Sequence, residues 1–94
     1  MRVKIRFFTK LREITEKKEE EVEVKNGTTV EEFLKILEER YGQTFKEYVR
    51  DRRGRLRDHL QYLVNGRNVK SSQGFATILN LDDTLAIIPP VGGG

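Results

Sequence analysis

The C-terminal residues are the part of this chain that is best suited to chemistry. Two consecutive prolines end the last apolar segment, and the chain then closes with Val91, Gly92, Gly93 and Gly94. Glycine loses more conformational entropy on ordering than any other residue, so such an ending does not pack by itself. Bare backbone can, however, enter a narrow channel in a partner with a free carboxylate at its tip. The pattern therefore favours either a frayed end or linker, or a reactive carboxyl group on Gly94.

Side chains for catalysis or metal binding are scarce in the rest of the sequence. There is no cysteine, which excludes disulfides, thiol nucleophiles and cysteine-ligated zinc or iron–sulfur centres. The single histidine, His59, lies in a basic stretch and is interpreted as an ordinary surface residue. No serine sits at a strand-to-helix elbow, and no glycine-rich stretch has a phosphate-binding pattern. We therefore expect no metal site, no stably bound cofactor and no catalytic site of the chain's own.

The basic segment, residues 50–58, is the one place in the sequence where nucleic acid could bind. Its arginines surround Gly54, which predicts an exposed loop, and the pI of the chain is about 9.3. Aromatic residues are not interleaved with these arginines for base stacking, and Asp51 and Asp58 dilute the positive charge. We interpret the segment as a solvated loop or a contact for an acidic partner. An RNA-binding module is kept as the alternative of another class.

The composition indicates one small domain with a well-solvated surface. The 94 residues suffice for a single core, and charged residues of both signs make up 35% of them, with a net charge of +3. No run of about 18 apolar residues is present to cross a membrane. The N-terminus lacks the apolar block of a signal peptide. We expect a cytoplasmic protein, in agreement with the absence of cysteine.

The N-terminal half predicts two strands and a helix. Residues 2–9 and 20–25 alternate apolar with charged side chains, which predicts half-buried strands joined by a loose connection over residues 11–19. Thr29 and Glu32 then form a capping-box sequence ahead of apolar residues at helical spacing. A helix should therefore begin at this point and terminate at the next glycine.

The C-terminal half predicts three more strands. A short helical turn is expected over residues 45–49, and Asn65-Gly66 is a strong hairpin signal because both residues tolerate positive φ. A turn at residues 81–83 precedes a last apolar strand over residues 84–88. We predict an α+β fold in which a mixed sheet of about five strands wraps on one main helix. The last strand should lie beside the first, and the other face of the sheet should stay open.

These features resemble the MoaD/ThiS-type family of ubiquitin-like sulfur carriers, which includes the small subunit of molybdopterin synthase. The resemblance rests on the order of elements, the opening at residues 3–13, the hairpin at residues 63–67 and the ending at residues 89–94. It therefore covers the whole chain. The insertion at residues 42–60 is most similar to the archaeal branch, which includes the small archaeal modifier proteins. The family implies a β-grasp, ubiquitin-like fold.

Two positions depart from the family's usual pattern. Relatives usually carry Asp-Gly-Asp in the turn before the last strand, and here Asp82 takes the place of the glycine. Aspartate is one of the few residues that tolerate a left-handed backbone. Gly92 stands where relatives often have alanine or serine. The resemblance implies a β-grasp domain over residues 1–90 and a flexible glycine tail over residues 91–94.

The resemblance also implies a carrier that acts through other proteins. In the family, an activating enzyme of the ubiquitin-activating type uses ATP and magnesium to adenylate the last carboxyl group, here that of Gly94. A sulfur donor converts it to a thiocarboxylate, which the large subunit of molybdopterin synthase uses in molybdenum cofactor biosynthesis. In the archaeal modifiers the same activated glycine is conjugated to lysines of target proteins. Both uses need the same activated end, so both stay open.

Alternation along the predicted strands also nominates a docking face. The residues expected to face the helix are Val3, Ile5, Phe7, Tyr62, Val64, Leu85 and Ile87. Phe8, Leu63 and Ile88 would then point outward from neighbouring strands, where similar positions form the recognition patch of ubiquitin. We call these three residues the docking patch and predict that it binds the activating enzyme. The alternative is that Phe8 merely packs beneath a loop.

Overall fold

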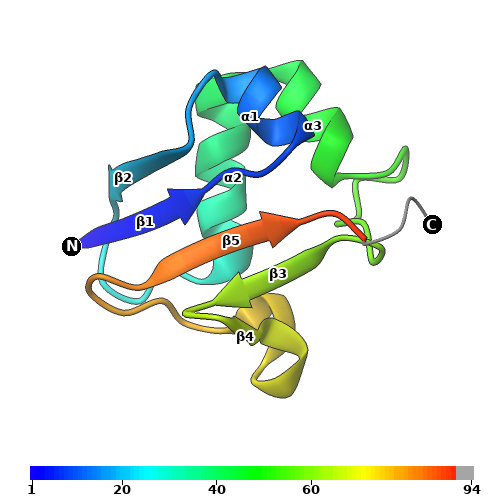
Figure 1. Cartoon of the computed structure of the whole chain (residues 1–94). Coiled ribbons are helices and arrows are strands. Elements are labelled where there is room, and N and C mark those ends of the chain that lie inside the picture. The colour runs from blue at the N-terminus through cyan, green and yellow to red at the C-terminus, as the bar shows by residue number, and fades with distance from the viewer. Residues whose placement is uncertain (91–94) are drawn as a thin grey trace.

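The computed structural model describes residues 1–90, in which five strands form one mixed sheet. In chain order they are β1 (Arg2–Arg6), β2 (Glu19–Glu23), β3 (Gln61–Val64), β4 (Arg67–Asn68) and β5 (Thr84–Ile88). Across the sheet the order is β2-β1-β5-β3-β4, as Figure 1 shows. Strands β1 and β5 are parallel, and all other neighbours are antiparallel. The predicted β-grasp arrangement, with the last strand beside the first, is confirmed.

Alternation along the strands decides which face of the sheet is buried. Val3 lies opposite Val22, and Ile5 lies opposite Leu85. All four side chains are buried, so the residues between them point to the other face of the sheet. Six of the seven residues predicted to face the helix are buried, whereas Val64 is only partly buried against the core beside the β3–β4 turn.

Helix α2 (Val30–Tyr41) packs on the buried face and begins where the capping box predicts. The backbone N–H of Glu32 donates to the Thr29 hydroxyl over 3.2 Å, and the backbone N–H of Thr29 donates to the Glu32 carboxylate over 2.9 Å. The apolar face of the helix buries Val30, Phe33, Leu34 and Leu37. The helix ends at Gly42, whose φ of 86° suits a residue without a side chain.

Two shorter helices, α1 (Lys10–Thr15) and α3 (Gln43–Val49), accompany the main helix. The expected turn over residues 45–49 is part of α3, but the loose connection predicted over residues 11–19 is wrong. Leu11 and Thr15 are buried four residues apart, and the Thr15 hydroxyl donates to the Leu11 carbonyl over 2.8 Å. These anchors lie among charged residues, so the apolar period of this short helix is too weak to recognise in the sequence.

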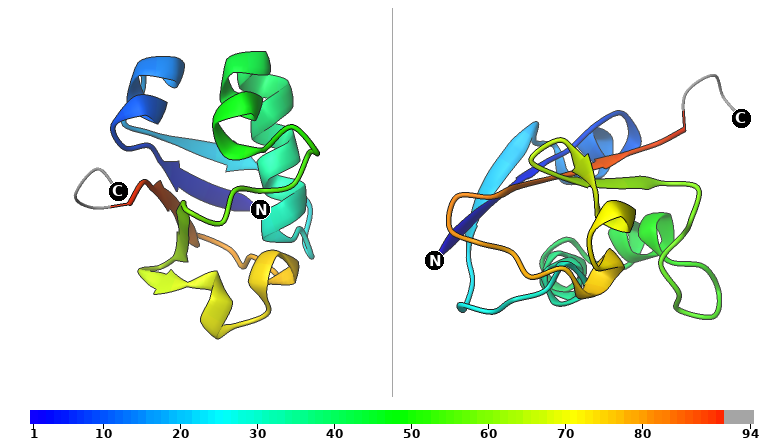
Figure 2. Two further views of the ribbon diagram at one scale, coloured as in Figure 1. Left: turned by 90° about the vertical axis from the view of Figure 1, so that its right-hand side faces the viewer. Right: turned by 90° about the horizontal axis from the view of Figure 1, so that it is seen from below.

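The helices divide the two faces of the sheet unequally. Figure 2 shows α2 and α3 together on one side of the sheet and α1 at its edge. Among the described residues no helix covers the opposite face, which we call the outer face. No helix of residues 1–90 is long and apolar enough to cross a membrane.

The tight turns adopt the predicted backbone conformations. Asn65 and Gly66 have φ of 51° and 82°, as the two-residue turn between β3 and β4 requires. Asp82 has φ of 66°, so aspartate does adopt the left-handed conformation in the turn before β5. The irregular stretch between β4 and that turn contains two short 3₁₀ helices, η1 (Val69–Ser71) and η2 (Gly74–Ala76).

Candidate functional site

The last residue of β5 lies at one end of the sheet, where β1 also ends and β3 begins. Ile88 lies opposite Gln61, the first residue of β3, on one side of this strand. On its other side β1 runs parallel to β5, so Phe8, which follows β1, lies toward the same end of the sheet. Pro89 and Pro90 are partly buried and end the described part of the chain. The predicted tail, Val91, Gly92, Gly93 and Gly94, lies outside the described residues.

The docking patch is half-buried rather than fully exposed. Leu63 lies opposite Ala86 in the register between β3 and β5, which makes Ile88 its diagonal neighbour. Their neighbours Tyr62 and Ile87 are buried in the core, so Leu63 and Ile88 point to the outer face. The structure thus places two of the three patch residues together, next to the chain's exit. The role of the patch in binding stays a prediction.

Phe8, the third patch residue, is half-buried and lies against two arginines. The guanidinium carbons of Arg6 and Arg12 are 5.4 and 5.5 Å from the centre of its ring. Arg12 is held there because its Nε donates to the Phe7 carbonyl over 2.9 Å. Sequence reasoning missed both arginines. Alternation along β1 assigns Arg6 to the outer face, but only the presence of α1 explains how Arg12 reaches Phe8.

Charges along the rest of β1 are paired with carboxylates of β2. Arg2 lies 3.6 Å from a Glu21 oxygen, and Lys4 lies 3.4 Å from a Glu19 oxygen. The N-terminal amine lies 3.1 Å from Glu23. All of these carboxylates are exposed, and each such pair is worth about 0–1 kcal/mol in water. The outer face is therefore a neutralised, polar surface at the start of β1.

The basic segment is not the freely solvated loop that the sequence predicts. Arg50 is buried, and it donates from Nη2 to Glu31 over 2.5 Å and from Nε to Glu38 over 2.8 Å. Burial works to lower the pKa of Arg50, but these two hydrogen bonds outweigh it and leave the pKa above its usual value. Leu56 is buried as well. The segment is therefore anchored twice, because Arg50 binds two carboxylates of α2 and Leu56 joins the hydrophobic core.

Several other groups of the basic segment form hydrogen bonds that hold the loop in its folded shape. Backbone N–H groups of Arg53 and Arg55 donate to the Asp51 carboxylate over 2.9 and 3.0 Å, which holds the pKa of Asp51 below its usual value. Arg57 donates to the Glu47 carbonyl. Figure 2 shows this loop on the side of the sheet that carries α2 and α3. It therefore does not extend the outer face.

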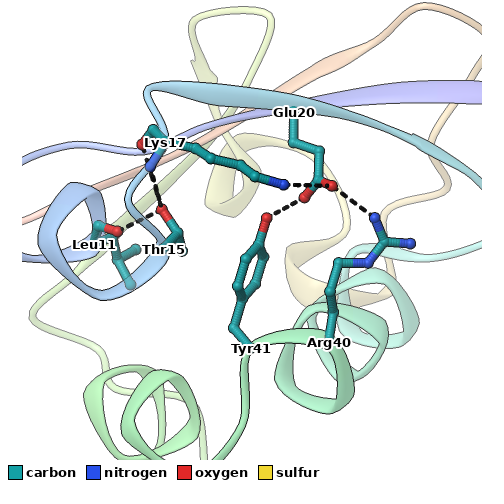
Figure 3. Close-up of polar contacts among 6 residues, drawn as sticks. All are labelled: Leu11, Thr15, Lys17, Glu20, Arg40 and Tyr41. Atoms are coloured by element: carbon teal, nitrogen blue, oxygen red, sulfur yellow. Dashed lines mark hydrogen bonds and ion pairs between the residues drawn. The ribbon is translucent and has the colours of Figure 1, made fainter.

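A second polar cluster joins the start of β2 to the end of α2. Glu20 accepts hydrogen bonds from Lys17 over 3.1 Å, from Arg40 over 2.7 Å and from the Tyr41 hydroxyl, as Figure 3 shows. Burial works to raise the pKa of Glu20, but the three donors outweigh it and hold the pKa below its usual value. Each charged group in the cluster has a partner, although two cations share the one carboxylate. The arrangement fastens two elements together and leaves no unpaired group for acid–base chemistry.

Residues that could bind a metal do not gather in the described part of the chain. Within residues 1–90 no group of three or more histidine, aspartate or glutamate side chains could hold a metal ion. His59 is exposed.

Comparison with known proteins identifies relatives along the full chain. The ThiS family profile matches residues 5–94. The small archaeal modifier protein 3 of Haloferax volcanii is 34% identical over 94 residues, which is all of both chains. A putative sulfur carrier protein of Archaeoglobus fulgidus is 32% identical over 66 residues, covering 70% of this chain and 74% of that one.

The fold has a close match among solved structures. The crystal structure of SAMP1 from Haloferax volcanii superposes with a TM-score of 0.87 at 26% identity. The match covers 100% of both chains, so it includes the insertion between α2 and β3 that carries the basic segment. Sequence and structure comparisons therefore lead to the same group of small proteins.

Proposed function

This chain belongs to the ThiS family of ubiquitin-like sulfur carriers and modifiers, and from that premise we propose that the carboxyl group of Gly94 is its working group. A carboxylate oxygen of Gly94 attacks the α-phosphorus of ATP in an activating enzyme, and magnesium pyrophosphate leaves. A sulfur donor then displaces AMP from the carbonyl carbon, which yields a thiocarboxylate. The chain supplies no catalytic side chain, because the enzyme binds the ATP and magnesium.

One observation supports this proposal above the others. The β-grasp domain ends its central strand β5 at Ile88, and only two prolines separate that strand from a tail of one valine and three glycines. Proline cannot continue the ladder because it has no backbone N–H, so pairing is terminated before the tail begins. Glycine presents no side chain to a narrow active site. The domain is therefore suited to presenting Gly94 to another protein.

The activated glycine has two candidate acceptors. In the sulfur-carrier reading, the thiocarboxylate enters the large subunit of molybdopterin synthase and gives its sulfur to molybdopterin. In the modifier reading, a lysine amine of a target protein attacks the activated carbonyl carbon and forms an isopeptide bond. The full-length identity of 34% to a small archaeal modifier protein favours the second reading as much as the resemblance to MoaD favours the first.

Intact mass spectrometry of the chain purified from its native cells tests the proposal and separates the two acceptors. A mass increase equal to the exchange of one oxygen for one sulfur indicates the thiocarboxylate. Larger species that share this chain through Gly94 indicate conjugation. The matched control is a chain that lacks Gly93 and Gly94, which should show neither change. Finding only the unmodified chain in cells that contain the activating enzyme would contradict the proposal.

We also propose that the docking patch recognises the activating enzyme. Leu63 and Ile88 lie together at the chain's exit, which supports a role in positioning the tail. Substitution of Phe8, Leu63 or Ile88 by aspartate should weaken binding to the enzyme, because each change buries a charge in an apolar contact. Binding measured by calorimetry that is unchanged in all three variants would rule out this role.

A further inference from the structure

The two arginines at Phe8 are the unpaired cations of the outer face. Arg6 lies opposite Glu19 in the register between β1 and β2, but the Glu19 carboxylate contacts Lys4 instead. Within residues 1–90, neither Arg6 nor Arg12 forms a salt bridge. Both guanidinium groups instead lie over the same aromatic ring. An attractive contact with the electron-rich ring face holds them there without neutralising them.

This arrangement prepares both arginines for an anion from outside the chain. The Arg12 guanidinium is oriented by its bond to the Phe7 carbonyl, and the Arg6 side chain lies on the same ring. Side chains that are already oriented lose less conformational entropy when a ligand binds. A guanidinium group presents paired donors that match the two oxygens of a carboxylate. Two adjacent guanidinium groups also repel each other, and a bound anion relieves that repulsion.

The location of the pair connects it with delivery of the tail. Arg6 lies opposite Ala86 of β5, two residues before Ile88. Four residues follow Pro90, and covalent geometry limits their reach to about 14 Å. A protein that receives Gly94 in its active site must therefore contact the domain close to the end of β5. The arginine pair and the apolar residues Leu63 and Ile88 would then share one interface.

We propose that Arg6 and Arg12, held on Phe8, bind carboxylate side chains of the enzyme that activates Gly94, beside an apolar surface that receives Leu63 and Ile88. This inference rests on the proposed function and adds the chemistry of the partner's surface. A protein surface fits better than a nucleic acid, because exposed Glu19, Glu21 and Glu23 lie along the neighbouring strand of the same face. Because these carboxylates are already paired with the N-terminal amine, Arg2 and Lys4, a polyanion that extends beyond the two arginines meets no unpaired cation along the described part of β1.

Steady-state activation measured with the full chain tests the inference. The readout is ATP–pyrophosphate exchange by the activating enzyme of the same organism, at increasing concentrations of the chain. Replacing both arginines, Arg6→Gln with Arg12→Gln, should raise the KM for the chain about tenfold and leave kcat unchanged, because two exposed charge pairs are lost in binding. Rising salt should increase the KM of the wild-type chain and have a smaller effect on this variant.

A matched control removes the same charge elsewhere. Arg52→Gln with Arg53→Gln changes two exposed arginines of the basic segment, on the side of α2 and α3, and should alter the KM less than about twofold. Equal KM values for both double variants would overturn the inference, because the effect would then come from net charge alone. An unchanged KM for the Arg6 and Arg12 variant would overturn it as well, provided that its urea midpoint matches the wild type.

Two further outcomes separate this inference from its premise and from RNA binding. If the wild-type chain supports exchange and the chain lacking Gly93 and Gly94 does not, the proposed function holds even when the arginine variant behaves as wild type. If the wild-type chain does not support exchange, both the proposed function and this inference are wrong. Fluorescence anisotropy with a labelled oligouridine gives the RNA test, since salt-sensitive binding that is lost with Arg6 and Arg12 would assign the pair to phosphates and overturn the inference.

Discussion

At the scale of single residues, Arg50 shows that a side chain's role can depend on partners far along the chain. It begins a run of arginines, yet it is buried against Glu31 and Glu38 of α2, and its Nη1 donates to the Gly54 carbonyl over 2.8 Å. One guanidinium group thus connects α2 with the start and the middle of the loop. Removing one partner of a buried pair leaves an uncompensated charge, which is the costly way to break it.

We predict that Arg50→Met destabilises the fold by about 3 kcal/mol, because Glu38 then remains buried without its cation. Urea unfolding followed by circular dichroism measures the change. Adding Glu38→Leu to Arg50→Met should restore part of the loss, since the orphaned carboxylate is removed too. The control Arg52→Met, at an exposed position, should change stability by less than about 0.5 kcal/mol. Equal midpoints for the two single variants would contradict the role of Arg50.

Glu20 makes a pH-dependent contribution to stability. Its three donors hold its pKa below the usual value of 4.5, so the folded state binds its proton less readily than the unfolded state does. The contribution is complete above the unfolded pKa and is lost as the pH falls through the lower folded pKa. Glu20→Gln should therefore lower the unfolding free energy at pH 7 and flatten its decline in acid. Glu39→Gln is the exposed control, and an equally flattened curve for it would disprove the assignment.

At the scale of elements, the strength of local signals explains which parts of the fold are recognisable. The start of α2 has a complete capping box, and the β3–β4 turn has Asn-Gly in a conformation that few other residues adopt. By contrast, α1 buries only Leu11 and Thr15 among charged residues, and two buried positions are too few to show a helical period in the sequence. Only its position against the sheet and α3 makes it a helix.

We predict that Thr29→Ala destabilises the protein by about 1 kcal/mol, because the N–H of Glu32 loses its acceptor at the start of α2. Thr29→Ser keeps a hydroxyl at the same place and should stay close to the wild type. Thermal unfolding of the two variants measures the difference. A loss in the serine variant as large as that in alanine would mean that packing of the threonine methyl, and not capping, stabilises the helix.

At the scale of the whole molecule, the order of strands decides where the chain is delivered. Because β5 is the central strand, its end is flanked by β1 and β3. The docking patch combines Ile88 of β5 with Leu63 of β3 and with Phe8, which follows β1, and the arginine pair comes from β1 and α1. Within residues 1–90 the core involves no residue after Ile87. The docking patch, the arginine pair and the exit of the tail therefore lie at the same end of the sheet, whereas the core lies between the sheet and α2.

We predict that a chain ending at Pro90 folds with the same stability as the full chain, because residues up to Ile87 already form a continuous buried core in the described part of the chain. Urea midpoints of the two chains should agree, whereas exchange of pyrophosphate by the activating enzyme should be abolished in the shorter chain. A markedly lower midpoint for the shorter chain would show that residues 91–94 contribute to the fold. The division into a domain and a tail would then be wrong.

The sequence by itself determined the strands, the main helix and the hairpin turn, because each carries its signal within a few neighbouring residues. Alternation placed Ile5 and Leu85 in the core, and the same alternation placed Leu63 and Ile88 on the opposite face. Only the tertiary structure decided that Arg50 is buried and that Arg6 and Arg12 meet on Phe8. Such contacts depend on which charged side chains the packing of separate elements brings together, and local spacing does not record that.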